Sequence, residues 1–215
     1  MKVIIYPSGS FLVNTLLIWD EGTGNAMVVD PGSKKAVEEV KEEVDKRDLN
    51  VKYILNTHEH PDHTAANVWA KLEFPDAKLI MHEEAAKHLN YWIESEIGRM
   101  AGAEYSPPPD RVVSDGDNIE LGDLLWKVVH TPGHSPGSVV VYDEDKNVAI
   151  VGDLIFKGSI GRYDLPMSNY EELKASIVKT LDILKPETIL LPGHGEKTTV
   201  AEELKNNPFI IELLK

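Results

Sequence analysis

Cysteine is absent from this chain of 215 residues, and its absence removes several classes of chemistry at once. Disulfide frameworks, thiolate zinc sites and cysteine nucleophiles are all excluded. Any metal ion must therefore be held by nitrogen and oxygen atoms. Long apolar runs are lacking as well. Because no stretch reaches the roughly 18 residues that a membrane-spanning helix needs, we expect no membrane partner.

Basic residues are also scarce: 22 lysines and arginines stand against 36 acidic residues, for a formal net charge of -14. Such a surface repels phosphate backbones and anionic lipid headgroups, so we expect no nucleic-acid partner. Asn14 and Thr15 interrupt the apolar N-terminal stretch and no small-residue cleavage site follows it, which argues against a signal peptide. We expect a cytoplasmic protein that acts on a small molecule, and the sequence leaves its oligomeric state open.

The length suits one sizeable α/β domain, and we expect a single domain over residues 1–215. Strands come first, then helices, then strands and helices again, an order that suits two central sheets with helices outside. The predicted strands cover 2–6, 11–20, 26–30, 51–56, 78–81, 119–121, 124–130, 138–142, 148–151 and 188–191. The predicted helices cover 33–47, 64–72, 83–90, 170–184 and 200–206, and residues 91–109 indicate a loop or cap over the site.

The densest cluster of chemically active side chains follows the predicted strand 51–56. His58-x-His60-x-Asp62-His63 places three imidazoles and a carboxylate in one short loop. Imidazole nitrogen and carboxylate oxygen are the ligands that borderline divalent metals prefer when thiolate is absent. The alternative is a solvated turn that happens to be rich in histidine. With only 8 histidines in the chain, the metal site is the favoured interpretation.

Three further candidates occur at equivalent places, each just beyond a predicted apolar strand. They are the final residues of Thr131-Pro-Gly-His134, Val151-Gly-Asp153 and Leu191-Pro-Gly-His194. Proline and glycine favour a tight turn that projects the next side chain from the edge of a sheet. Taken singly, each histidine is better explained as a structural turn residue, and Asp153 is explained equally well in either way. Together with the first cluster they predict one site.

The motif Thr57-His-Glu-His-Pro-Asp-His63, with Asp30 before it and three further ligands after it, resembles the metallo-β-lactamase superfamily. The resemblance runs from Val28-Val-Asp-Pro-Gly32 to Leu191-Pro-Gly-His-Gly195. It implies an αββα sandwich of two mixed sheets with helices on both outer faces. It also implies two divalent metal ions, zinc being expected and iron or manganese remaining open. The implied ligands are His58, His60 and His134 on one ion, Asp62, His63 and His194 on the other, and Asp153 between them.

Within that superfamily the chain is similar to compact relatives of glyoxalase II, the hydroxyacylglutathione hydrolases. Gly158-Ser-Ile-Gly-Arg-Tyr-Asp-Leu-Pro166 and Asn207-Pro208-Phe209 carry this closer resemblance. The full C-terminal helical extension of the long glutathione enzymes is not expected here. The resemblance implies hydrolysis of thioesters such as S-D-lactoylglutathione, with a hydroxide between the two ions as the nucleophile.

Several residues are assigned roles around the predicted metals. Asp62 and Asp30 are the candidate catalytic residues, and Asp30 is expected to orient a ligand imidazole, unless it only caps the Asp-Pro-Gly turn. Arg162, Tyr163 and Lys157 are candidate substrate contacts. The two cations suit an anionic substrate, although either could be a plain surface charge. Four residues of the irregular stretch could line a pocket or belong to the core: Tyr91, Trp92, Ile93 and Met100.

Other functions share parts of this pattern. A persulfide dioxygenase of the same fold binds a single iron and consumes oxygen, and a lactonase or β-lactamase attacks a different carbonyl. RNA-processing nucleases carry a similar motif, but they need a basic surface that this chain lacks. A purely structural metal site is the remaining alternative, and seven ligands exceed the four that a closed structural zinc site uses. Among the remaining histidines, His82 and His88 are expected on a solvated helix, while His130 ends a strand.

Overall fold

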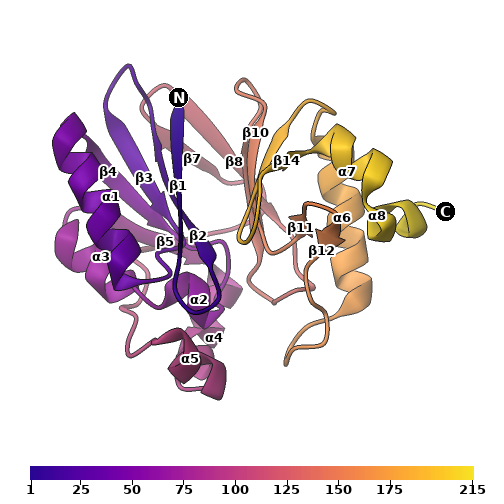
Figure 1. The fold of residues 1–215 in the computed structure, drawn as a ribbon, viewed down its shortest axis with the longest axis horizontal. Helices are drawn as coiled ribbons and strands as arrows, with labels where there is room; N and C mark the ends of the chain where they lie inside the picture. Colours follow the sequence, from indigo (N-terminus) through magenta and orange to yellow (C-terminus); the bar gives the residue numbers. More distant parts are fainter.

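The computed structural model describes residues 1–215, which form two six-stranded sheets packed face to face. The first sheet has the order β1-β2-β3-β4-β5-β6 and the second the order β14-β13-β10-β9-β8-β7. Helices α1 and α3 cover the outer face of the first sheet, and α6, α7 and α8 cover that of the second (Figure 1). Both sheets mix parallel and antiparallel pairs. The predicted αββα sandwich is therefore confirmed.

The elements alternate along the chain much as the sequence predicts. The strands of the first sheet are β1 (Lys2–Ser8), β2 (Val13–Trp19), β3 (Asn25–Val29), β4 (Asn50–Leu55), β5 (Lys78–His82) and β6 (Arg111–Val113). Those of the second are β7 (Asn118–Leu121), β8 (Leu124–His130), β9 (Val139–Asp143), β10 (Val148–Gly152), β13 (Ile189–Pro192) and β14 (Thr198–Thr199). A small hairpin, β11 (Ile155–Phe156) and β12 (Ser159–Ile160), stands apart. The helices are α1 (Lys34–Arg47), α2 (Pro61–Thr64), α3 (Asn67–Glu73), α4 (Glu83–Ile93), α5 (Glu96–Ala101), α6 (Tyr170–Ile183), α7 (Val200–Asn206) and α8 (Pro208–Leu213).

The layered core follows from strands that are buried on both faces. In β2, Leu16 and Ile18 belong to the cluster between the sheets, which includes Trp126 of β8. Leu17 and Trp19 point the other way and pack in the cluster under α1 and α3. Successive side chains of a strand point to opposite faces, so one apolar run fills two layers. Each such buried side chain contributes about 1.5–3 kcal/mol to folding.

Helix α1 shows how local sequence signals set an element. Ser33 caps its first turn, with the hydroxyl accepting a hydrogen bond from the Ala36 amide at 3.1 Å. The helix ends at Asp48, whose left-handed backbone (φ 55°) stops the α-helical path. Its buried stripe faces the first sheet and consists of Ala36, Val37, Val40 and Val44. The prediction of a helix here is confirmed.

The single helix predicted over residues 64–72 is wrong, because the structure has two shorter helices there. Pro61, at the first turn of α2, starts the helix earlier than predicted, since its fixed φ suits that position. The chain then leaves the helical path at Ala66, whose amide donates to the Pro31 carbonyl at 2.9 Å, and resumes as α3. This break holds the loop after β3 against the loop after β4.

The irregular stretch predicted over residues 91–109 contains a helix that the sequence reasoning missed. Helix α4 continues to Ile93, and α5 follows after Ser95, which caps it by accepting from the Gly98 amide at 3.0 Å. A Cβ on Gly98 would lie 2.2 Å from the Ile93 carbonyl oxygen, so the tight junction between the two helices requires glycine. The same glycine lowers helix propensity and hides the helix in the sequence. Helices α2, α4 and α5 gather at the lower edge of the sandwich (Figure 1).

That edge collects the carboxyl ends of several strands. β3 and β4 run parallel, as do β10 and β13, and β8 shares the direction of β10 because both are antiparallel to β9. The loops after these strands therefore emerge together, at one rim of the two sheets. No helix in the structure has the length and apolar character needed to cross a bilayer.

Candidate metal centre

The seven predicted ligands come from four segments at this rim, and three of these segments contain a proline in or just before the ligand residues. His58 and His60 lie in the loop after β4, and Asp62 and His63 lie in the first turns of α2. The other three follow β8, β10 and β13 and are His134, Asp153 and His194. The first sheet thus supplies four of the side chains and the second sheet supplies three, and all meet between the two.

Three imidazoles form the first group. The Nε2 atom of His58 lies 3.0 Å from Nδ1 of His60, and ring contacts join both to His134. Their potential ligand atoms all lie within 4.8 Å of one another. All three side chains are buried. Two ring nitrogens this close and out of water leave room for one cation that both can bind.

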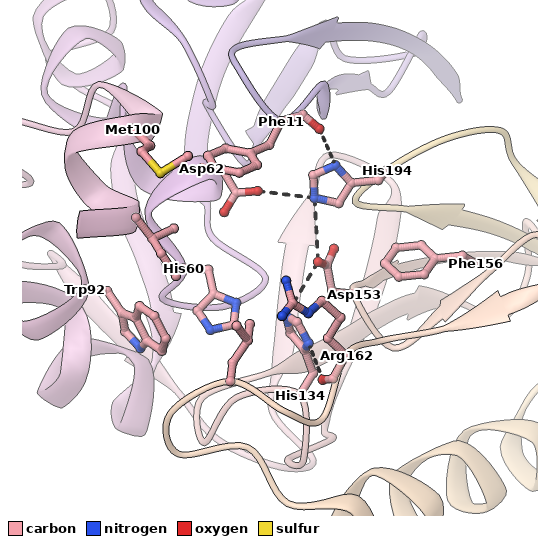
Figure 2. A pocket seen from close by; sticks show the side chains of 12 residues that line it. Phe11, His60, Asp62, Trp92, Met100, His134, Asp153, Phe156, Arg162 and His194 are labelled. Carbon is pink, nitrogen blue, oxygen red and sulfur yellow. Dashed lines mark hydrogen bonds and ion pairs between the residues drawn. The ribbon is translucent and has the colours of Figure 1, made fainter. Parts of the chain in front are cut away.

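The second group joins a carboxylate to two imidazoles. His194 Nε2 lies 3.3 Å from Asp62 Oδ2 and 3.3 Å from His63 Nε2. Asp153 stands between the groups, with Oδ1 at 3.4 Å from His63 Nε2 and Oδ2 at 3.5 Å from His134 Nε2. Figure 2 shows Asp62, Asp153, His134 and His194 turned toward one another in the cavity. The carboxylate of Asp153 is therefore placed to touch both groups.

The outer nitrogens of the rings are anchored by the surrounding chain. Asp30 Oδ2 accepts from His63 Nδ1 at 2.9 Å, and backbone carbonyls accept from Nδ1 of His134 and of His194. In His58, Nδ1 lies 3.0 Å from the Thr57 hydroxyl, which in turn donates to Asp30 at 2.7 Å. A hydrogen on Nδ1 leaves Nε2 with its lone pair facing the cluster, as metal-binding histidines require.

These residues fit a divalent metal centre on the evidence of unpartnered atoms. His134 Nε2 and Asp153 Oδ1 are buried and have no hydrogen-bond partner. A buried polar atom without a partner costs about 1–3 kcal/mol, and two of them point into one cluster. Bound cations would satisfy both. The donor set of nitrogen and oxygen suits zinc, iron and manganese alike.

The electrostatics of the cluster are those of bases held close together. Burial and the neighbouring imidazoles lower the pKa of His58 and His60 well below the usual value. Burial acts the same way on His63, but three carboxylates around it outweigh this effect and raise its pKa to about 10. Burial raises the pKa of Asp62, yet His63 and His194 overcome that effect and hold the pKa well below the usual value. Without cations, His63 is therefore an imidazolium at neutral pH, with a proton on Nε2 in addition to the one on Nδ1.

The first hairpin secures the last of the seven residues. The Asn14 side-chain amide donates to the carbonyls of Pro192 at 3.0 Å and Gly195 at 2.9 Å. The backbone carbonyl of Phe11, in the loop between β1 and β2, accepts a hydrogen bond from His194 Nδ1 at 3.0 Å. Strand β2 begins at Val13 and not at residue 11 as predicted, which frees Phe11 for this contact.

Beside the cluster lies a cavity of about 440 Å³. Its polar wall is His60, Asp62, His134, Asp153, His194 and Arg162, and its apolar wall is Phe11, Trp92, Ile97, Met100, Phe156 and Leu165. Trp92 and Met100 were among the candidates for a pocket, whereas Ile93 lies in the core and Tyr91 is exposed outside this lining. Phe11, Ile97, Phe156 and Leu165 were not among these candidates, because nothing in the local sequence shows which apolar side chains face the cavity.

Of the three predicted substrate contacts, the structure places only Arg162 in the cavity wall. Its guanidinium forms two hydrogen bonds to Asp164, at 2.9 and 3.1 Å. Lys157 is instead paired with Glu196. Tyr163 packs against another ring, that of Tyr170, with centroids 4.6 Å apart. Neither Lys157 nor Tyr163 lines the cavity.

One histidine outside the ligand set is not in the surroundings that the sequence predicts. His82 is buried rather than solvated, and its ring stacks on that of His130 at 3.9 Å.

Glu59, between the first two ligands, accepts hydrogen bonds from the Ser135 hydroxyl at 2.9 Å and the Gly137 amide at 3.3 Å. It thereby ties the loop that carries His134 to the loop after β4. A charged residue inside the motif was the only signal of this role.

Comparison with known proteins extends these observations. A family model described as the metallo-beta-lactamase superfamily matches residues 9–194. A protein of Aquifex aeolicus described as uncharacterized is 40% identical over 100% of this chain and 99% of its own length. The hydroxyacylglutathione hydrolase GloC of Haemophilus influenzae is 34% identical over 98% of each chain.

Solved structures also resemble the fold over nearly the whole chain. The B3 metallo-beta-lactamase BLEG-1 has a TM-score of 0.85 at 30% identity, covering 97% of this chain and 99% of that one. TTHA1623 in a di-iron-bound form has a TM-score of 0.80 at 31% identity, covering 96% and 99%. ETHE1 from Myxococcus xanthus has a TM-score of 0.80 at 25% identity, covering 99% and 85%.

Proposed function

We propose that this chain, which belongs to the metallo-beta-lactamase superfamily, is a metal-dependent hydrolase of thioesters such as S-D-lactoylglutathione. One observation carries the proposal: seven nitrogen and oxygen donors converge on a cavity whose wall contains no serine, threonine, cysteine or lysine. The carboxylates and imidazoles in the wall belong to the proposed ligand set, and no hydroxyl, thiol or amine stands beside them, so water is the expected attacking group. The similarity to GloC supports a thioester as the substrate.

The residues would divide between two divalent ions. His58, His60 and His134 would hold one, Asp62, His63 and His194 the other, with Asp153 between them. When bound, the ions would supply Lewis acidity toward a carbonyl oxygen and lower the pKa of water. Zinc is the expected metal, and the di-iron form of TTHA1623 keeps iron open. Seven donors are more than one ion needs.

The protein side chains prepare this chemistry in two ways. Asp30 and the backbone carbonyls fix the ring orientations, so the donor nitrogens need no rearrangement during a reaction. Asp62 lines the cavity and stays ionised, because the nearby imidazoles lower its pKa. An ionised carboxylate there can accept a hydrogen bond from attacking water and orient it. A thiolate leaves without strong acid assistance, so no general acid is required.

Two alternatives have specific support. The structural similarity to ETHE1 favours a persulfide dioxygenase with one iron, and the similarity to BLEG-1 favours attack on a lactam or lactone carbonyl. Metal content separates the first from hydrolysis: two ions per chain favour the hydrolase, whereas one iron with oxygen uptake favours the dioxygenase. Rates on a lactone and a β-lactam beside the thioester decide the second.

The test begins with protein loaded separately with zinc, iron or manganese, with ions counted by elemental analysis. We expect two ions per chain and hydrolysis of S-D-lactoylglutathione. His134→Ala should lose more than about 100-fold in activity, since even indirect ligand partners are worth 10–100-fold. His88→Ala is the matched control, because His88 lies on α4 outside the cluster. Full activity of metal-depleted protein, or of His134→Ala, would contradict the proposal.

A further inference from the structure

We infer that the cavity binds an uncharged, apolar part of the substrate, so that the preferred substrates are thioesters of apolar acyl chains on a neutral thiol. This inference rests on the proposed thioester hydrolysis but changes its example: S-D-lactoylglutathione, a polar acyl group on an anionic thiol, would be hydrolysed more slowly than a neutral, apolar thioester. It departs from the expectation, based on Arg162 and Lys157, that an anionic substrate is bound. Three features of the protein support it: the apolar wall of the cavity, the pairing of the nearby cations, and the net negative charge of the chain.

The apolar wall is assembled from separate parts of the chain. Ile97 and Met100 come from α5, Phe11 from the first hairpin, and Phe156 from β11. In Figure 2, Met100 and Phe156 lie on opposite sides of the ligand residues. Met100 is 64% exposed and Phe11 is 38% exposed. Apolar side chains left open around one polar cluster favour a ligand that covers them.

The two cations that the sequence assigns to substrate binding are already paired with carboxylates. Arg162 is the one lysine or arginine in the wall, and Asp164 occupies its guanidinium with two hydrogen bonds. Lys157 is held by Glu196. Glutathione carries two carboxylates at neutral pH, and neither would find an unpaired cation in the cavity wall itself. The chain's net charge of -14 adds repulsion at longer range.

The first experiment compares four thioesters on the metal-loaded protein. Acetyl and hexanoyl groups are each carried by N-acetylcysteamine, which is neutral, and by glutathione. Each methylene that the cavity buries is expected to raise kcat/KM by up to about fourfold. We expect hexanoyl-N-acetylcysteamine to be the best of the four, at least about tenfold better than hexanoylglutathione. Equal or better rates on the glutathione thioesters, or rates independent of the acyl chain, would overturn the inference.

A second measurement does not depend on catalysis. The thioethers S-hexyl-N-acetylcysteamine and S-hexylglutathione cannot be hydrolysed, and their binding to the metal-loaded protein is measured by isothermal titration calorimetry. We expect the neutral thioether to bind more tightly. If no thioester is hydrolysed but this preference is observed, the proposed function fails and the inferred cavity chemistry stands. If neither thioether is preferred, the inference fails even when hydrolysis is observed.

Three variants then test the residues themselves. Met100→Lys places a cation in the cavity wall and should shift the ratio of kcat/KM toward the glutathione thioester by at least about threefold. Leu72→Lys is the matched control, because Leu72 is 65% exposed on α3 and lies outside the cavity wall. Asp164→Asn releases Arg162 and should favour the glutathione thioester by about two- to fivefold, the range of an exposed charge pair. Unchanged ratios of kcat/KM in both Met100→Lys and Asp164→Asn would contradict the inference.

Discussion

Replacing Asp30 separates two roles that this carboxylate combines. It accepts hydrogen bonds from the amide and the hydroxyl of Thr57, at 2.8 and 2.7 Å, and from His63 Nδ1 at 2.9 Å. Through the Thr57 hydroxyl it also reaches His58. Its backbone is left-handed, with φ 48°. Asp30 therefore both shapes the turn after β3 and orients two of the proposed ligands.

Asp30→Asn keeps the shape and changes the hydrogen bonding. Asparagine tolerates the left-handed conformation, so the turn should survive. One carboxylate oxygen becomes an amide group that cannot accept: it faces either the Thr57 amide, at the Oδ1 position, or both the Thr57 hydroxyl and His63, at the Oδ2 position, and in either case His63 loses its anionic partner. Losing the partner of a metal-bound imidazole lowers metal affinity by about 10–100-fold. This corresponds to about 1.4–2.8 kcal/mol of binding free energy.

Asp30→Ala should damage the fold as well. The left-handed backbone costs about 1–2 kcal/mol without a side chain that stabilises it. Each buried donor left unpaired on Thr57 costs about 1–3 kcal/mol more. With two such donors on Thr57, we therefore expect a loss of about 3–8 kcal/mol in the free energy of unfolding, measured by urea denaturation of the metal-free protein. Asp30→Asn should lose clearly less than Asp30→Ala.

Metal affinity is measured by competition with a chromophoric chelator. If Asp30→Asn binds metal as tightly as the native chain, Asp30 only caps the turn and the orienting role is refuted. If the asparagine and alanine variants unfold at the same urea concentration, the assignment of backbone strain is refuted instead.

Two further predictions concern the cluster and its loops. The pKa of His63 is raised to about 10 in the metal-free fold, above its unfolded value of about 6.5, so its stabilising contribution is complete below about 6.5 and is lost as the pH rises toward 10. Metal binding must displace this proton from His63. The affinity for metal should therefore rise by up to about tenfold per pH unit between pH 7 and 9. An affinity that does not change with pH would show that His63 is not a ligand. Gly133→Ala should lower the free energy of unfolding by about 1–3 kcal/mol more than Gly116→Ala, measured by urea denaturation. Both glycines have a positive φ, so the backbone strain is shared. Only at Gly133 would a Cβ meet another chain segment, 2.1 Å from the Leu173 amide nitrogen. Equal costs at the two positions would contradict this contact.

The sequence predicts the framework well because its signals are long and local. The apolar stripe and Ser33 cap of α1 are both readable, as are the buried strands that precede each proposed ligand. The glycines and prolines before His134 and His194 predict tight turns; the structure has bends at Gly133 and Gly193, and Pro192 still belongs to β13. These features need only the period of a helix or strand and the chemistry of a turn.

The cavity wall was less predictable, because it depends on contacts between distant segments. Nothing near Phe11 indicates that it will meet His194, and nothing near Arg162 shows whether Asp164 will fold back on it. Elements of two or three residues, such as β6 and β11, are too short to show a period. Helix α8 was missed as well, although Asn207 caps it and Pro208 opens it.

The anchoring of His194 by Phe11 and Asn14 has a consequence for the order of folding. These contacts join residues separated by 178 to 183 positions along the chain. Contacts of such long sequence separation form slowly, because a large loop must close before they stabilise anything. During synthesis on the ribosome, the loop after β1 has no partner until residues 192–195 have emerged. The cluster of seven donors is therefore completed only after residue 194 has emerged, when the last donor docks against the first hairpin.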